Sequence, residues 1–151
     1  MRTIVWIMLT ASLIAQGETK SSLAGVWKMD PGRSDFGPGP VSESRLDRIT
    51  LDGSSLKDTI TQKLRGGKER TYDMIYTLDG KECTNHVNGN LVKSSARWEG
   101  EELVVDSRVF AFLKADMNDR WSVSPDGKIL TLVRHITGAR HADQKVVFER
   151  Q

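Results

Sequence analysis

The chain has little that could crosslink it, since Cys83 is the only cysteine among its 151 residues. It can form no internal disulfide, and its stability must come from a packed core. We interpret Cys83 as a small buried apolar residue, with an intermolecular disulfide as the alternative.

Recognisable catalytic motifs are also missing. The sequence has no G-x-S-x-G elbow, no H-E-x-x-H and no glycine-rich phosphate loop, and the run Gly37-Pro38-Gly39-Pro40 offers too few backbone N–H donors to cradle a phosphate. Asp116 and Asp119 are expected in a turn as solubilising charges. An enzyme is therefore the least supported class, and we expect no cofactor.

A metal site could be drawn from Cys83, His86, His135 and His141, which are residue types that bind Zn²⁺. On a strand, however, Cys83 and His86 point to opposite faces, and nothing in the sequence brings the two later histidines beside them. We expect no metal.

An excess of one charge is absent as well. The chain has 22 Lys and Arg against 20 Asp and Glu, a formal charge of +2, and the two signs are interleaved along the sequence. The absence of a basic stripe argues against a nucleic-acid partner.

The first 15 residues resemble a secretory signal peptide. Arg2 precedes a short apolar run, and the small residue Ala15 precedes polar Gln16. The run is shorter than the roughly 20 residues that span a bilayer. We therefore expect a signal peptide at 1–15, a polar leader at 16–22, a single domain at 23–151, no stable membrane span in the mature chain, and a secreted or periplasmic protein; a retained anchor is the alternative.

What the chain has in quantity is turn-forming pairs at regular intervals, between segments of alternating or β-branched residues. Glycine and asparagine supply the positive φ of hairpin turns. The pairs are Asp52-Gly53, Gly66-Gly67, Asp79-Gly80, Asn88-Gly89, Glu99-Gly100, Asp126-Gly127 and Thr137-Gly138. They predict an all-β, antiparallel up-and-down meander of about ten strands that closes into a barrel, with a Pro/Gly-rich irregular connector at 30–44 and one possible helical turn at 110–117.

The two-residue period of the strands indicates which side chains point inward. Both apolar and polar residues fall on the inner faces. The polar ones require an internal cavity, pairing with one another, or a different register, because dry unpaired burial is costly. The candidate ligand contacts are Gln62, Arg70, Tyr72, Met74, Tyr76, Trp98, Trp121 and Arg134.

Two functions remain open at this point. The barrel could bind a small hydrophobic or amphipathic ligand, with Arg70 or Arg134 meeting an anionic head group. Alternatively, the core could be filled and the domain could serve a structural or protein-interaction role.

The opening Gly25-Val26-Trp27 and the closing Val146-Val147-Phe148-Glu149-Arg150 resemble the lipocalin and fatty-acid-binding-protein superfamily. The resemblance implies a barrel of 8–10 strands in which Trp27 plugs one end, Arg150 packs across it, and Gly25 permits their close approach; Arg134 is the second candidate for the arginine. The run from Gly25 to Gly37 also resembles the start of small exported bacterial proteins, which implies export but no particular chemistry.

Overall fold

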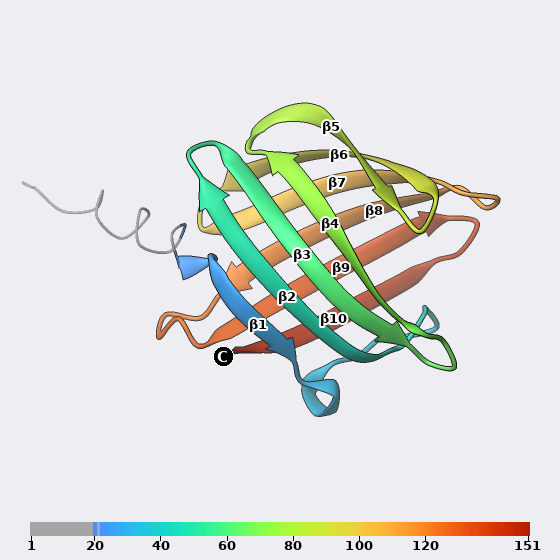
Figure 1. Ribbon diagram of the computed structural model, residues 1–151, viewed down its shortest axis with the longest axis horizontal. Helices are drawn as coiled ribbons and strands as arrows, with labels where there is room; N and C mark the ends of the chain where they lie inside the picture. Colours follow the sequence, from blue (N-terminus) through green and yellow to red (C-terminus); the bar gives the residue numbers. More distant parts are fainter. Residues whose placement is uncertain (1–19, 21) are drawn as a thin grey trace, which may run out of the picture.

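The computed structural model describes residue 20 and residues 22–151, which form one antiparallel ten-stranded sheet curved into a nearly closed barrel (Figure 1). The strands are β1 (Gly25–Met29), β2 (Ser42–Asp52), β3 (Ser55–Leu64), β4 (Glu69–Thr77), β5 (Asp79–Val87), β6 (Asn90–Glu99), β7 (Glu102–Phe110), β8 (Ala115–Val123), β9 (Ile129–Gly138) and β10 (Ala142–Arg150). The predicted all-β meander is confirmed.

The expected signal peptide lies outside the described residues. Within them, no helix combines the length and apolar character needed to cross a membrane.

The strand order is β4-β3-β2-β1-β10-β9-β8-β7-β6-β5, so the first and last strands pair in the middle of the sheet. The two edge strands, β4 and β5, face each other without a ladder between them. Asn85 of β5 crosses this gap: its Oδ1 accepts a hydrogen bond from Ile75 N at 2.8 Å, and its Nδ2 donates one to Ile75 O at 2.9 Å. One side chain therefore imitates a ladder pair where the backbone does not provide one.

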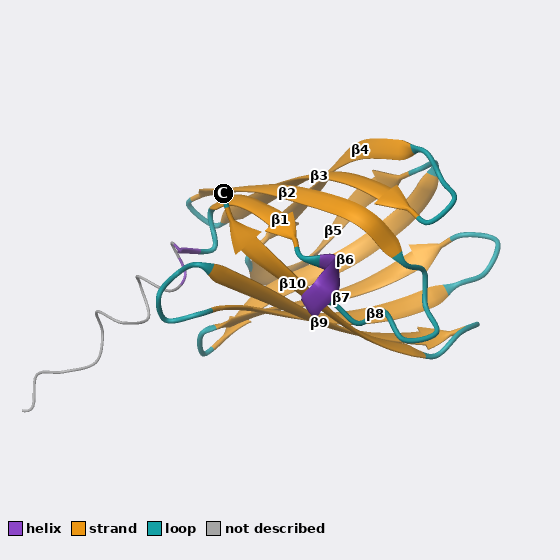
Figure 2. Ribbon diagram, turned by 90° about the horizontal axis from the view of Figure 1, so that it is seen from below, coloured by secondary structure: helices purple, strands orange, loops and turns teal. Residues whose placement is uncertain are grey.

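Side chains alternate between the barrel interior and the solvent, as the sequence predicts. On β3, Leu56, Asp58 and Ile60 are buried, whereas Lys57 is exposed. Figure 2 shows that most of the described chain is strand wrapped around this interior. The core therefore forms from the inward residues of many short strands rather than from any long apolar segment.

One end of the barrel, which we call the closed end, carries both the start of β1 and the C-terminus. The guanidinium of Arg150 lies 4.2 Å from the centre of the fully buried Trp27 ring. Its Nη1 donates to Ala24 O at 2.9 Å and its Nε to Gly127 O at 2.7 Å. Gly25, at φ +150°, lies so close that a Cβ there would be 2.3 Å from Arg150 Nη1.

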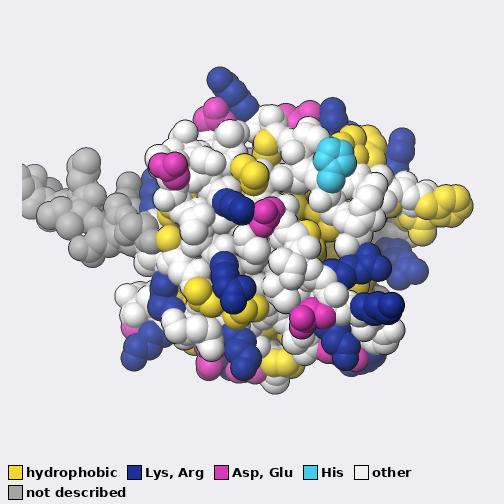
Figure 3. All heavy atoms as spheres, viewed as in Figure 1, with side chains coloured by type: hydrophobic (Ala, Val, Ile, Leu, Met, Phe, Trp, Pro, Cys, Tyr) yellow, Lys and Arg dark blue, Asp and Glu magenta, His cyan; other side chains and the backbone are white. Residues whose placement is uncertain are grey.

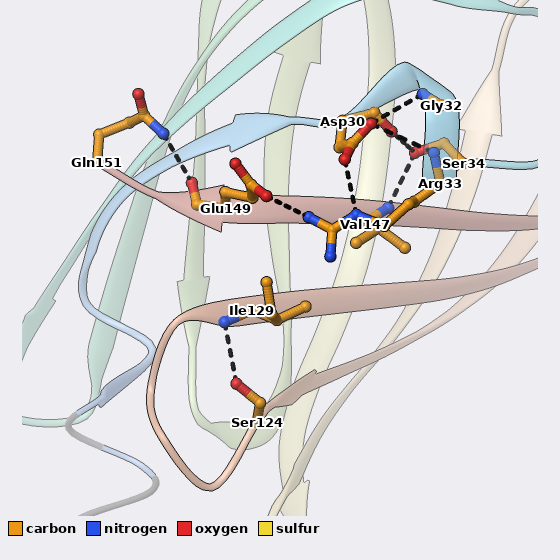
Figure 4. Close-up of polar contacts among 9 residues, drawn as sticks. All are labelled: Asp30, Gly32, Arg33, Ser34, Ser124, Ile129, Val147, Glu149 and Gln151. Atoms are coloured by element: carbon orange, nitrogen blue, oxygen red, sulfur yellow. Dashed lines mark hydrogen bonds and ion pairs between the residues drawn. The ribbon is translucent and has the colours of Figure 1, made fainter.

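The connector after β1 is more regular and shorter than expected. Pro31–Arg33 form a 3-10 turn, in which Asp30 Oδ1 accepts from Gly32 N at 2.8 Å (Figure 4). Ser34 Oγ accepts from Val147 N at 3.0 Å and fastens the connector to β10. The prediction that irregular structure extends to residue 44 is wrong, because β2 already begins at Ser42 and pairs there with Leu64.

The turn expected around Asp116 and Asp119 is also misplaced. Both residues lie within β8, and the real turn between β7 and β8 lies at 111–114. That turn lies inside the segment 110–117 in which the sequence allows one helical turn, but it is not helical. It contains no glycine or asparagine, so no turn-forming pair marks it.

Candidate functional site

A cavity of about 160 Å³ lies inside the barrel between β3, β4 and the β6–β9 region. Six of the predicted ligand contacts line it: Gln62, Tyr72, Met74, Tyr76, Trp121 and Arg134. Asn88, from the turn between β5 and β6, also lines it and is exposed. The cavity is therefore reached from the end of the barrel opposite Trp27, which we call the open end.

A second cavity, of about 200 Å³, adjoins the first towards the connector. The two share Arg45, Gln62, Met117 and Arg134. Phe36 and Val146 contribute apolar surface on the far side. Two arginines therefore stand where the two spaces meet.

Each of these arginines is held by an inward carboxylate. Arg45 Nε and Nη2 lie 2.8 and 2.7 Å from the oxygens of Asp47, and Arg134 Nε and Nη2 both lie 2.7 Å from those of Asp119. Bidentate pairs of this kind fix the guanidinium planes. Burial opposes the charge of each arginine, but the facing carboxylate outweighs it and raises the pKa of both guanidinium groups above their ordinary value.

The pairs leave one nitrogen of each arginine unused. Nη1 of Arg45 and Nη1 of Arg134 form no hydrogen bond within the described part of the chain. Since a guanidinium carries five N–H donors, each arginine keeps donors available to a molecule in the cavities.

Asp58 lies deeper in the same interior. Its side chain is fully buried, and neither carboxylate oxygen has a partner among the described donors. Burial, followed by the negative charge of Asp47, raises the pKa of Asp58 well above its usual range. A neutral Asp58 carries a proton that it can donate to Asp47, so the two arginines and their two carboxylates leave the interior without net charge.

Polar side chains continue from this cluster towards the second cavity. Tyr72 donates its hydroxyl to Gln62 Oε1 at 3.0 Å, and Gln62 Nε2 donates to Ser42 Oγ at 2.5 Å. Burial, followed by the charge of Asp119, raises the pKa of Tyr76 well above its usual value, so this hydroxyl stays neutral. The interior thus answers the question left by the sequence: its polar groups both pair with one another and border a cavity.

Two predicted contacts lie elsewhere. Arg70 has the inward parity, but it sits at the start of β4 beyond the barrel wall and is exposed. Trp98 packs against the core near the closed end, with Lys20 Nζ 5.6 Å from its ring centre. Neither side chain lines the cavity, so the geometry gives neither a part in ligand contact.

Sequence reasoning missed Arg45, Asp47 and Asp119. The alternation Arg45, Asp47, Ile49 along β2 could have indicated an inward polar face, but the opposite face of the same strand offers Leu46 and is equally ambiguous. Asp119 was hidden by the misplaced turn. What no pattern in the sequence reveals is that Arg134 of β9 meets Asp119 of the neighbouring strand β8.

The cysteine and histidines form no common site. Cys83 Sγ donates to Ser94 O at 3.2 Å, and His86 is exposed on the other face of β5. The rings of His135 and His141 lie 6.4 Å apart, and His135 Nδ1 contacts Asp143. Within the described range, no group of three or more His, Cys, Asp or Glu side chains could hold a metal ion.

No family model matches the sequence, and no curated protein matches it. Solved structures are similar in fold. A secretory abundant heat soluble protein from Ramazzottius varieornatus is 16% identical, with a TM-score of 0.65, over 87% of this chain and 96% of its own. A Schistosoma mansoni fatty acid binding protein in complex with arachidonic acid is 15% identical (TM-score 0.58; 88% and 98%). A zebrafish ileal bile acid-binding protein complexed with cholic acid is 13% identical (TM-score 0.58; 87% and 99%). The chain therefore has the calycin-like fold of the fatty-acid-binding-protein barrels.

Proposed function

We propose that the barrel binds a small amphipathic molecule with an anionic head group, and that it acts as a binding protein rather than an enzyme. The observation that carries the proposal is the cavity of about 160 Å³ bordered by two arginines, each with an unused Nη1. A mostly apolar pocket with a few placed polar groups is the usual form of a ligand site.

The lining supports this division of roles. Ile60, Met74 and Val92 offer apolar contacts to a tail, and Arg45 and Arg134 offer donors to a head group at the junction of the two cavities. Asp47 and Asp119 already balance the charges of the two arginines, and Asp58 is neutral, so an anionic head group would bind through the two unused Nη1 groups without a further charged acid beside it. A neutral head group would forgo the charge-assisted hydrogen bonds.

The cavity volume limits the size of the ligand. A cavity of about 150 Å³ accommodates a single benzene ring. The first cavity therefore suits a short chain or one ring, and a longer molecule would also occupy the second cavity past the arginines. The neighbours named with arachidonic acid and cholic acid lend support, because both compounds are amphipathic carboxylic acids.

Titration of delipidated protein with carboxylic acids of increasing chain length tests the proposal. Binding is followed by the change in tryptophan emission, to which Trp121 in the cavity wall contributes, and by native mass spectrometry. We expect saturable binding and at least a tenfold preference for an acid over the alcohol of the same length. Absence of saturable binding for every compound, with an empty cavity in protein from its own host, would contradict it.

The head-group role needs a variant that leaves no buried charge unpaired. The double change Arg134→Met and Asp119→Leu removes one pair completely, which avoids the cost of a lone buried carboxylate. We expect the preference for acid over alcohol to fall while alcohol binding persists. Arg108→Met with Asp116→Leu, a pair on the outer face, is the matched control and should change neither.

We also propose that the chain is exported, on the strength of the apolar run after Arg2 and the small residue Ala15. The intact mass of protein isolated from its own host tests this. A mature chain beginning near Gln16 outside the cytoplasm is expected, and a cytoplasmic chain that still begins at Met1 would refute it.

A further inference from the structure

The charges on the turns of the barrel are sorted between its two ends. At the closed end, every hairpin turn or its flank carries an acid: Asp52, Asp79, Glu99, Glu101 and Asp126. The four hairpin turns at the open end, at 65–68, 88–89, 111–114 and 139–141, contain no acid, although Glu69 flanks the first of them and Asp116 and Asp143 lie two residues beyond the third and fourth. The turns at the open end therefore carry more cations than acids, whereas the strands beside them carry both signs.

The open end also carries cations that have no salt-bridge partner among the described residues. Arg65, Lys68, Arg70, Lys114 and Arg140 are all exposed, and none forms a salt bridge with a described residue. Other cations are paired: Lys63 and Arg108 near the open end bind Glu43 and Asp116, and Lys57, Lys81 and Arg120 towards the closed end each face a carboxylate within 4 Å. The acids of the connector are engaged locally, since Asp30 binds Arg33 and Asp35 Oδ1 accepts from Gly37 N at 2.9 Å.

Apolar side chains project from the same end. Phe112 is fully exposed and Leu113 is 54% exposed, at the tip of the turn between β7 and β8. Figure 1 shows this turn reaching beyond the neighbouring strands on the right, and Figure 3 shows hydrophobic side chains standing out there with Lys and Arg nearby. Ala139 N donates to Lys114 O at 3.3 Å, which joins this turn to the one that carries Arg140.

A fully exposed phenylalanine at a hairpin tip contributes nothing to the core, and its exposure is unfavourable in water. Apolar side chains surrounded by unpaired cations are suited to the boundary between anionic head groups and acyl chains. The cations also stand on turns around the rim, from β3–β4 to β9–β10, so a broad, flat anionic surface can meet them together.

We propose that the open end docks on an anionic lipid bilayer, with Phe112 and Leu113 inserted and the rim cations against the head groups. The inference goes beyond the proposed ligand and does not depend on one. It places the cavity entrance, bordered by Asn88, against the membrane. The ligand would then pass between bilayer and barrel without crossing open water.

Vesicle flotation of the full chain tests the proposal, with phosphatidylcholine vesicles compared with mixtures that contain phosphatidylglycerol. We expect binding that requires the anionic lipid and weakens with salt. Phe112→Ser should weaken it at least tenfold. Lys68→Gln and Arg140→Gln should each weaken it about fivefold.

The controls lie outside the open end. Ile75→Ser removes another half-exposed apolar side chain, on the outer face of β4, and Lys81→Gln removes a cation near the closed end. Both should bind as the parent does. Every variant keeps residues 1–15, so any binding by that apolar segment is common to all of them.

A second measurement reports insertion directly. In Phe112→Trp, the emission added to that of the parent should shift to the blue on anionic vesicles and be quenched by brominated acyl chains. Ile75→Trp should show neither effect. Vesicle binding that is unchanged by the open-end variants, or an unquenched Trp at position 112, overturns the proposal. Retention on single-stranded DNA without vesicle binding would also overturn it and would identify a different anionic partner.

Discussion

The replacement Asp58→Asn should make the protein more stable relative to the parent as the pH rises. Asp58 is fully buried, and its pKa is raised by burial and by Asp47. Above the usual carboxyl range, the unfolded chain releases this proton while the folded chain retains it. Stability from Asp58 is therefore fully present below the unfolded pKa and is lost as the pH rises through the folded one.

The expected change in the free energy of unfolding follows from the one extra proton that Asp58 holds in the folded chain. Where the folded chain holds one proton more than the unfolded chain, the free energy of unfolding falls by about 1.4 kcal/mol for each pH unit. A proton held up to neutral pH lowers parent stability by about 2.8 kcal/mol between about pH 5 and pH 7. The asparagine variant loses nothing by this route, and its amide can donate to Asp47 as the protonated acid does.

Urea unfolding of parent and variant across this pH range, followed by circular dichroism, measures the difference. Asp73→Asn on the neighbouring strand is the control. Hydrogen bonds from Thr59 and Lys57 lower the pKa of this exposed carboxyl, so its contribution is lost only as the pH falls below the unfolded value. The difference in free energy of unfolding between Asp73→Asn and the parent should stay constant above about pH 5. If the free energy of unfolding of Asp58→Asn differs from that of the parent by a constant amount over the same pH range, the reasoning is refuted.

Three further outcomes follow from contacts within the barrel. Arg150→Lys, which loses the stacked guanidinium and its fork of hydrogen bonds to backbone carbonyls, should lower the free energy of unfolding by about 2 kcal/mol in urea titrations. Asn85→Leu should cost about 1 to 3 kcal/mol and speed hydrogen exchange at the amide of Ile75, and unchanged exchange there would contradict the bridge across the gap. Arg134→Met alone should cost about 3 kcal/mol because it leaves Asp119 unpaired, and adding Asp119→Leu should restore most of that loss.

The fold could be predicted from local patterns because most hairpins carry their own turn signal. Glycine pairs mark most turns, and the alternation along residues 54–64 is steep enough to identify the buried face of β3. Turn-forming pairs do not mark the turn between β7 and β8, where Phe112 and Leu113 occupy the tip.

The site could be predicted only in part. Tyr72, Tyr76 and Arg134 follow from strand parity, which is a local property. The partnership of Arg134 with Asp119 depends on the register between β8 and β9, and register is set by turns at both ends of a strand. Arg70 shows the converse limit, since parity gives the direction of a side chain but not whether the barrel wall extends that far.

The strand order places the two ends of the chain at the centre of the sheet and the middle of the chain at its edges. β1 and β10 pair in the centre of the sheet, and Gln151 N donates to Val26 O at 2.9 Å. The unladdered edges belong to β4 and β5, which Leu78 joins in the middle of the sequence. The barrel is thus two meanders held together by the first and last strands. A circular permutant that joins residue 151 to the start of β1 and opens at Leu78 would keep every ladder, and it would become a single uninterrupted meander with its edges at its termini.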